Sequence, residues 1–193
     1  MRPGWGLRHP ALTKLLASEV SPAAVEETAW ANGAVPLRIA AHTRAAELPD
    51  ELVLSVRCIV LVEDDIVVCS NRDGILHPWA GGRREGDETV VETACREAHE
   101  ETGWLVDPES LRPLGWLHFE HLREQSVDHP WPHPDFLQVV YAGRASDRDG
   151  GADVEWTDTE GYELSSQRMT LDDAATAVRQ DRLALAFLRM LST

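Results

Sequence analysis

GGRREGDETVVETACREAHEETGW, from Gly81 to Trp104, is the most informative stretch of this sequence. It holds seven carboxylates, and three of them, Glu97, Glu100 and Glu101, crowd the last turns before Gly103. Like charges three or four residues apart on a helix destabilise it by a few tenths of a kcal/mol per pair. The stretch therefore needs a reason for keeping these side chains together.

The spacing of apolar residues in this stretch predicts a helix from about Glu88 to Thr102, ended by Gly103 as the C-terminal cap. At 100° per residue its apolar stripe consists of Val90, Val91, Ala94, Cys95 and Ala98. Glu101 falls in line with this stripe, about 20° from Ala94, whereas Glu92 points to the opposite, solvated side. The preceding residues, NRDGILHPWAGGRREGD, are turn-rich and indicate a loop.

Most carboxylates on an acidic helix are simply solvated. That explanation is poor for Glu101, because it would face the core side near the helix C-terminus, where the helix dipole disfavours negative charge. A folded protein keeps such a cluster most readily when cations neutralise it. All-oxygen ligands favour hard ions, so the cluster predicts a site for Mg²⁺ or Mn²⁺.

The segments around this helix alternate between strand-like and helical patterns. LVLSVRCIVLV, Leu52 to Val62, is apolar and β-branched, as expected of a strand buried on both faces, and IVVCS reads as its hairpin partner. LGWLHFEHL and DFLQVVYAGRA are further predicted strands, and LDDAATAVRQDRLALAFLRMLST is predicted to form one or two helices. Together they predict an α/β fold with a mixed β-sheet between helices.

The first 50 residues differ from the rest. They contain ALTKLLASEV, SPAAVEETAWANG and PLRIAAHTRAAEL, short Ala-rich pieces broken by Pro and Gly. We expect a helical N-terminal extension at residues 1–50, followed by the main domain at residues 51–193. The largely apolar extension is a candidate surface for a homodimer.

Composition and charge narrow the classes of partner. The chain has 193 residues, 43% of them hydrophobic, and a formal net charge of -15. This charge disfavours nucleic acid and anionic membranes, but an acidic protein binds an anionic substrate when divalent cations bridge the two. Cys58, Cys69 and Cys95 lie in apolar runs without metal-ligand spacing, and no run has the length of a signal peptide or a membrane span. We expect a cytoplasmic protein.

The run from Gly82 to Trp104 resembles the signature box of the Nudix hydrolases in every fixed position. It reads glycine, five residues, Glu88, seven residues, Arg96-Glu97-Ala98, one residue, Glu100-Glu101, one residue, Gly103-Trp104. The resemblance implies the α/β/α sandwich of that family over about Leu52 to Thr193. Ala98 and Trp104 stand where a larger aliphatic residue is usual, and WAGG stands where many members have Pro before the glycines. These departures concern packing and loop shape more than chemistry.

The resemblance also implies residue roles. Glu97, Glu100 and Glu101 would bind the divalent cations, with the carbonyl of Gly82 completing the shell, and Arg96 would orient the carboxylates. Glu88 has two readings. It either pairs with Arg96 two turns further along the helix or lies in the first helical turn, where negative charge is favourable.

Several residues outside the box are further candidates. Family members often use a later acidic residue as an extra ligand or general base, and DTEGYELSS offers Glu160 and Glu163, of which we prefer Glu163; the alternative is that both are ordinary loop carboxylates. Trp79 and Trp131 are candidate platforms for a planar group of the substrate. HPWPHPDF loosely resembles a motif of NADH diphosphatases, and its alternative is a rigid Pro-rich turn. The remaining candidates, which lack clear ligand spacing and are expected to be ordinary polar residues, are His118, His121, His129 and His133.

Three functions are compatible with these observations. The first is a metal-dependent hydrolase of a small molecule in which a nucleoside diphosphate is linked to another moiety. The second is a Nudix-fold isomerase of isopentenyl diphosphate, which would need a reactive cysteine, whereas Cys58 lies in a buried-looking strand. The third is a non-catalytic sensing or interaction module, in which the acidic cluster would be eroded. The intact cluster favours the hydrolase.

Overall fold

A computed structural model describes residues 6–18, 21–125, 131–151, 156, 158 and 161–192. Its strands are β1 (Ala24–Trp30), β2 (Val35–His42), β3 (Val53–Val62), β4 (Asp65–Asn71), β5 (Leu76–His77), β6 (Trp104–Val106), β7 (Arg112–His121), β8 (Asp135–Arg148) and β9 (Glu163–Met169). Its helices are α1 (Pro10–Ser18), α2 (Val90–Thr102), α3 (Leu171–Ala177) and α4 (Arg182–Leu188), with 3₁₀ turns η1 (Asp50–Leu52), η2 (Pro108–Ser110) and η3 (Arg189–Leu191).

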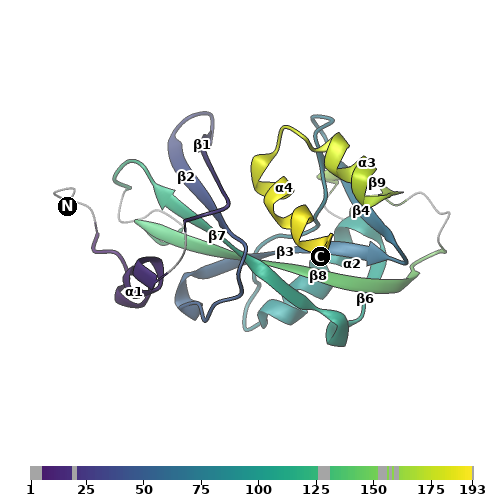
Figure 1. The fold of residues 1–193 in the computed structure, drawn as a ribbon, viewed down its shortest axis with the longest axis horizontal. Helices are drawn as coiled ribbons and strands as arrows, with labels where there is room; N and C mark the ends of the chain where they lie inside the picture. The colour runs from purple at the N-terminus through teal and green to yellow at the C-terminus, as the bar shows by residue number, and fades with distance from the viewer. Residues whose placement is uncertain are drawn as a thin grey trace.

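The strands form one mixed sheet in the order β1-β2-β7-β8-β3-β4-β5, with β9 on β4 and β6 on β8. The pair β3–β8 is parallel, with Val56 opposite Val139. The neighbouring pairs β7–β8 and β3–β4 are antiparallel. Figure 1 shows β3 and β8 running through the middle of the molecule, with α3 and α4 together on one side of the sheet.

Helices cover both faces of this sheet, which makes the α/β/α sandwich. On one face, Ala94 and Ala98 of α2 pack against Cys58 and Val60 of β3. On the other face, Phe187 of α4 lies in a second cluster that contains residues of β2, β3, β4 and β7. Complete burial of a phenylalanine side chain contributes about 1.5–3 kcal/mol to stability. Strand β3 is thus covered on both sides, as its continuous apolar run predicts.

The predicted elements of the main domain are confirmed with small shifts of their ends. The expected strand Leu52–Val62 is β3, its hairpin partner is β4, and the two later predicted strands lie within β7 and β8. The predicted central helix is α2, which begins at Val90 because Thr89 is its N-cap, and it ends at Gly103 as expected. The C-terminal tail forms α3 and α4.

The prediction of helices throughout residues 1–50 is only partly right. The N-terminal helix α1 is present, but residues 24–42 form the antiparallel hairpin β1–β2, so the helical reading of that segment is wrong. Helix propensity is a weak preference, and here alternate residues Leu37, Ile39 and Ala41 of β2 enter the core while the strand pairs with β7. The turn signal in WANG was the clue, since Ala31, Asn32 and Gly33 all have positive φ.

Strands β6 and β9 were not expected from the sequence. The sequence predicts a loop around Glu163, yet Glu163 is the first residue of β9 and opposes Asn71 of β4. None of the helices in the described ranges is long and apolar enough to cross a membrane.

Candidate active site

Helix α2 presents the acidic cluster. At its start, Thr89 accepts a hydrogen bond from the backbone N–H of Glu92, and the Glu92 side chain accepts one from Thr89 in return, which forms a capping box. At its end, Gly103 has a φ of 73°, a left-handed conformation that glycine adopts without a steric penalty. The helix is therefore fixed at both ends, and Glu97 lies buried on the side of the preceding loop.

The loop before α2 runs along the edge of β3. Backbone N–H groups of Val56 and Arg84 donate to Gly82 and Leu54 respectively, and Cys58 exchanges two hydrogen bonds with Ala80. These bonds hold Gly82 against α2 so closely that a Cβ there would collide with the carboxylate of Glu97. The carbonyl of Gly82 already accepts the Val56 N–H at 3.0 Å, which leaves one lone pair for another partner.

Arg96 gathers three carboxylates. Its Nε and Nη2 bond both oxygens of Glu88 at 2.7 and 3.0 Å. Its Nη1 donates to Glu97 at 2.9 Å and to Glu100 at 2.8 Å, and Nη2 also reaches the carbonyl of Arg83 at 2.9 Å. Of the two readings of Glu88, pairing with Arg96 is therefore the one observed. The bonds to Arg96 lower the pKa of the Glu88 carboxyl to about 2.

The pKa values of Glu97 and Glu101 are raised, in contrast to that of Glu88. Burial raises the pKa of Glu101 to about 8, although the charge of Arg57 and a 2.9 Å hydrogen bond from the Gly81 N–H partly counteract it. Burial also raises the pKa of Glu97, despite its bond to Arg96. Two carboxyl groups that resist losing their protons are held next to one another. A divalent cation nearby would reverse this balance and favour their ionised forms.

Residues of β5 and β9 face the helix from the far side of the site. Glu163 is 3% exposed, and its Oε2 lies 3.0 Å from Nε2 of His77. The geometry of this contact is not that of a hydrogen bond, so Oε2 of Glu163 can still accept a hydrogen bond from another group. Asp158, also buried, accepts hydrogen bonds from the backbone N–H groups of Tyr162 and Glu163. Glu160 lies outside the described residues.

These groups surround one cavity of about 590 Å³. The candidates that line it are Trp79, Gly82, Arg96, Glu97, Glu100, Glu101 and Glu163. The lining also includes residues that the sequence did not single out, namely Arg57, Asn71, His77, Asp158 and Tyr162. One signal was available for Arg57, since it is the charged residue inside the apolar run of β3.

The two candidate tryptophans lie differently. Trp79 lines the cavity but is 8% exposed, with its ring edge-on to Phe187 at 6.2 Å between centroids. Trp131 packs against Trp30 at 5.2 Å, and the guanidinium of Arg83, a cavity residue, sits 5.1 Å above its ring. Trp131 is not itself among the residues that line the cavity, but it packs against Arg83, which is.

Of the candidate histidines that the structure describes, none lines the cavity. His118 and His121 are buried in β7, where His118 Nε2 contacts Asp135 at 2.6 Å. His133 lies near His121, with ring centroids 6.5 Å apart, and His129 lies outside the described residues.

A model of the NUDIX domain matches residues 51–187. The chain belongs to the Nudix family. The resemblance seen in the Gly82–Trp104 box is thus confirmed, and with it the assignment as a Nudix hydrolase at the level of the family. None of the curated proteins compared with this Nudix chain matches it.

Several solved structures are similar to this chain. The Bacillus subtilis pyrophosphohydrolase BsRppH is 17% identical, with a TM-score of 0.50 over 75% of this chain and 77% of that one. A NUDIX hydrolase from Nitrosomonas europaea is 16% identical, with a TM-score of 0.49 over 72% and 86%. An ADP-ribose pyrophosphatase from Streptococcus suis is 18% identical, with a TM-score of 0.45 over 73% and 92%. At this identity the likeness to BsRppH shows a shared fold and nothing about substrate.

The Nudix family generally uses divalent metals, and the donor set here has suitable chemistry. The carboxylates of Glu97, Glu100 and Glu101 offer hard oxygen donors beside a cavity, and the space next to Gly82 is too narrow for a Cβ. As they stand, these side chains bond to Arg96 and to Gly81 rather than to one common point. Accordingly, no three His, Cys, Asp or Glu side chains in the described part of the chain already converge at metal-binding distances.

Proposed function

We propose that this Nudix protein is a divalent-metal-dependent hydrolase that cleaves the diphosphate linkage of a nucleoside diphosphate joined to another moiety. One observation carries the proposal: Glu97, Glu100 and Glu101 line the same cavity. Arg96 bonds to both Glu97 and Glu100, and Gly82 packs against the carboxylate of Glu97. A diphosphate is anionic, and a cavity rich in carboxylates binds it when cations bridge the two.

Each residue has a proposed role in this reaction. Glu97, Glu100 and Glu101 hold Mg²⁺ or Mn²⁺, with the free lone pair of the Gly82 carbonyl as a further donor. When bound there, the cations would neutralise charge on the phosphoryl group and lower the pKa of the attacking water. Arg96 fixes the rotamers of the carboxylates through its planar set of donors.

The far wall of the cavity supplies the remaining proposed groups. Glu163 is the extra ligand or the general base, because its Oε2 has acceptor capacity and lies on the cavity wall opposite α2. Trp79 and Trp131 border the bound substrate, Trp79 directly and Trp131 through Arg83.

The two alternatives have less support. An isomerase would need a reactive thiol, but Cys58 is fully buried, and burial raises the pKa of its thiol to about 12. A non-catalytic module would not need an acidic cluster that costs helix stability, and here all three carboxylates are retained beside the cavity.

The wider assignments are proposals as well. We assign the protein to the cytoplasm, with a small-molecule diphosphate as its substrate and neither nucleic acid nor membrane as a partner, in keeping with its net charge of -15. The proposed domain division is residues 1–50 and 51–193, supported by a family match that begins at residue 51. A homodimer through the N-terminal extension is the proposed assembly.

The test is a turnover panel with Mg²⁺ and Mn²⁺ that covers nucleoside triphosphates, ADP-ribose, NADH, nucleotide sugars and dinucleoside polyphosphates. At least one diphosphate should be split into two phosphorylated products, and excess chelator should abolish the reaction. Full turnover in chelator would overturn the metal dependence. Turnover of none of these substrates would overturn the proposed function.

A further inference from the structure

Arg57 is a charged residue in a place where the sheet otherwise buries apolar side chains. It lies in the middle of β3, is half-buried, and lines the cavity together with Glu97, Glu101 and Glu163. Its Nη1 donates a hydrogen bond to the carbonyl of Gly81 at 2.6 Å. Keeping a guanidinium at such a position costs desolvation energy, so its charge needs a partner.

The protein itself supplies few acceptors for the guanidinium of Arg57. A guanidinium has five N–H donors, and within the described ranges the Gly81 carbonyl is the acceptor that Arg57 reaches. No carboxylate in the described part of the chain lies within ion-pair distance of it. The nearby carboxylates are engaged elsewhere, since Glu97 bonds to Arg96 and Glu101 to the N–H of Gly81.

Holding the loop does not account for Arg57 either. Backbone hydrogen bonds already tie Ala80, Gly82 and Arg84 to β3, on both sides of Gly81. One additional bond to the Gly81 carbonyl would not require a planar cation with several donors to spare. The spare donors indicate an anion that enters the cavity from outside.

The charges of the cavity specify what kind of anion this is. Its lining holds six carboxyl groups and three guanidinium groups, those of Arg57, Arg83 and Arg96. Arg96 is saturated by carboxylates, and Arg83 is exposed above Trp131. Arg57 is thus the half-buried cation that remains available next to the proposed metal ligands. Its fork of donors matches two oxygens of one tetrahedral phosphate.

We propose that Arg57 binds one phosphate group of the diphosphate substrate through two non-bridging oxygens. It touches substrate and is therefore a binding residue of the reaction, distinct from the metal ligands on α2. This inference rests on the proposed function for the identity of the substrate. Binding of a diphosphate, however, can be measured without any turnover.

The experiment measures binding of methylene diphosphonate, a non-hydrolysable diphosphate, by calorimetry in the presence of saturating Mn²⁺. Wild-type protein should bind it, and Arg57→Ala should weaken binding by tenfold to a hundredfold, about the value of a hydrogen bond between charged groups. Arg57→Lys, which keeps the charge but loses the fork, should fall between the two. If Arg57→Ala does not fold, the diphosphonate affinity of Arg57→Lys tests the inference by itself.

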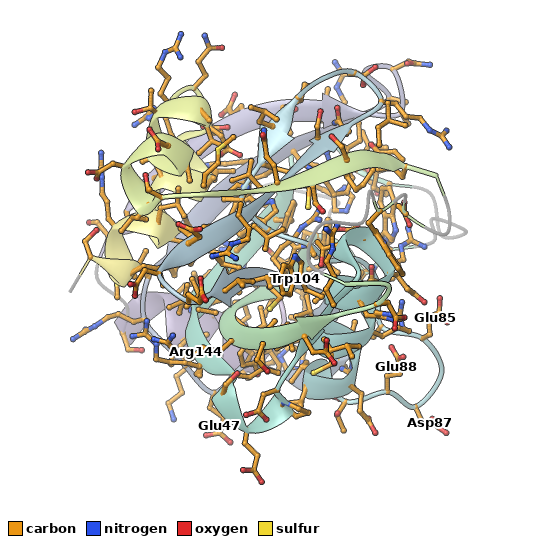
Figure 2. All side chains as sticks on the ribbon, turned by 90° about the vertical axis from the view of Figure 1, so that its right-hand side faces the viewer. Glu47, Glu85, Asp87, Glu88, Trp104 and Arg144 are labelled. Atoms are coloured by element: carbon orange, nitrogen blue, oxygen red, sulfur yellow. The ribbon has the colours of Figure 1, made fainter. Side chains whose placement is uncertain are left out.

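Arg144→Ala is the matched control. Arg144 is exposed on β8, its side chain donates only to the Glu63 carbonyl in the described structure, and its removal changes the net charge by the same amount. Figure 2 shows it on the opposite side of the view from Glu85 and Glu88, which belong to the loop before α2. Its diphosphonate affinity should equal that of the wild type.

Binding of Mn²⁺ alone separates a phosphate ligand from a structural role. Removing a positive charge near Glu97 and Glu101 should leave Mn²⁺ affinity unchanged or raise it. If Arg57→Ala and Arg57→Lys bind diphosphonate like wild type, or lose it only in proportion to a loss of Mn²⁺ affinity, the inference is overturned. Wild-type protein that binds no diphosphonate also overturns it. Diphosphonate binding that depends on Arg57, without hydrolysis of any substrate, supports the inference and overturns the proposed function instead.

Discussion

At the scale of single residues, the proposed site contains two neighbouring carboxyl groups with different surroundings. Glu100 is held by Arg96, whereas Glu101 is more deeply buried and bonds only to a backbone N–H among the groups described here. We predict that Glu100→Gln and Glu101→Gln each lower turnover at least about a hundredfold, or roughly 2.7 kcal/mol of transition-state stabilisation, because each removes an anionic ligand from a hard cation. Steady-state kinetics with Mg²⁺ measures this.

The control for this prediction is Glu92→Gln. Glu92 is exposed, and its capping bonds to Thr89 require only an acceptor oxygen, which glutamine retains. Its turnover should be nearly that of wild type. Metal-free stability should hold or rise for Glu101→Gln, because the buried carboxyl is replaced by an isosteric neutral group. Normal turnover by all three variants would show that the cluster is only a solvated helix face, and damage by Glu92→Gln equal to that of the other two would contradict the catalytic assignment.

A second prediction at this scale concerns His42 and the pH dependence of stability. Its ring is 5% exposed and stacked 4.0 Å from Trp116, and burial lowers its pKa to about 4, with help from the charges of His118 and Arg38. The unfolded chain titrates near 6.5, so between pH 6.5 and 4 the unfolded state binds the proton and the folded state does not. Stability is therefore lost as the pH falls through that window, by about 2 kcal/mol at pH 5.

Urea unfolding of wild type and His42→Phe at pH 7.5 and 5.0 isolates this contribution. The variant keeps an aromatic ring but cannot titrate, so its loss of unfolding free energy between the two pH values should be about 2 kcal/mol smaller. Identical losses in the two proteins would mean that His42 titrates normally in the folded state.

At the scale of elements, the position of α2 depends on its N-terminal cap. Thr89→Ala removes the hydroxyl that accepts the Glu92 N–H and should lower the free energy of unfolding by about 1 kcal/mol. Thr13→Ala is the matched change on α1, where the exposed hydroxyl bonds only to the carbonyl of His9, and it should stay within about 0.5 kcal/mol of wild type. Chemical denaturation of both variants gives the comparison. If Thr89→Ala and Thr13→Ala lowered the free energy of unfolding equally, the Thr89 cap would contribute no more than an ordinary surface hydroxyl.

The elements also show what the sequence could and could not predict. Strand β3 and helix α2 were predictable because each has a clear apolar period and, for α2, a glycine in the position of a cap. Hairpin β1–β2 was not, since its alanines suit a helix and its strand character comes from pairing with β7. In the site, Glu97, Glu100 and Glu101 share one local motif, whereas His77 and Asp158 reach the cavity through tertiary contacts that no local pattern encodes.

At the scale of the whole molecule, bound metal should stabilise the fold. Any ligand that binds only the folded state adds about 2.7 kcal/mol at a concentration of 100 times its Kd. For a chain of 193 residues this should raise the melting temperature by roughly 5 to 10 °C in Mn²⁺, and chelator should reverse the shift. Differential scanning calorimetry with and without Mn²⁺ measures it. A Glu101→Gln variant that gains as much as wild type would place the metal elsewhere.

The parallel pairing of β3 with β8 has a consequence for how the chain reaches its native state. Residues 53–62 leave the ribosome before residues 135–148, so β3 has no central neighbour to pair with until residues 63–134 and then β8 itself have been synthesised. Such long-range pairing is slow and exposes unpaired strand edges to other nascent chains. We expect the yield of folded protein to depend on the rate of synthesis, and slower expression at low temperature to favour soluble protein over inclusion bodies.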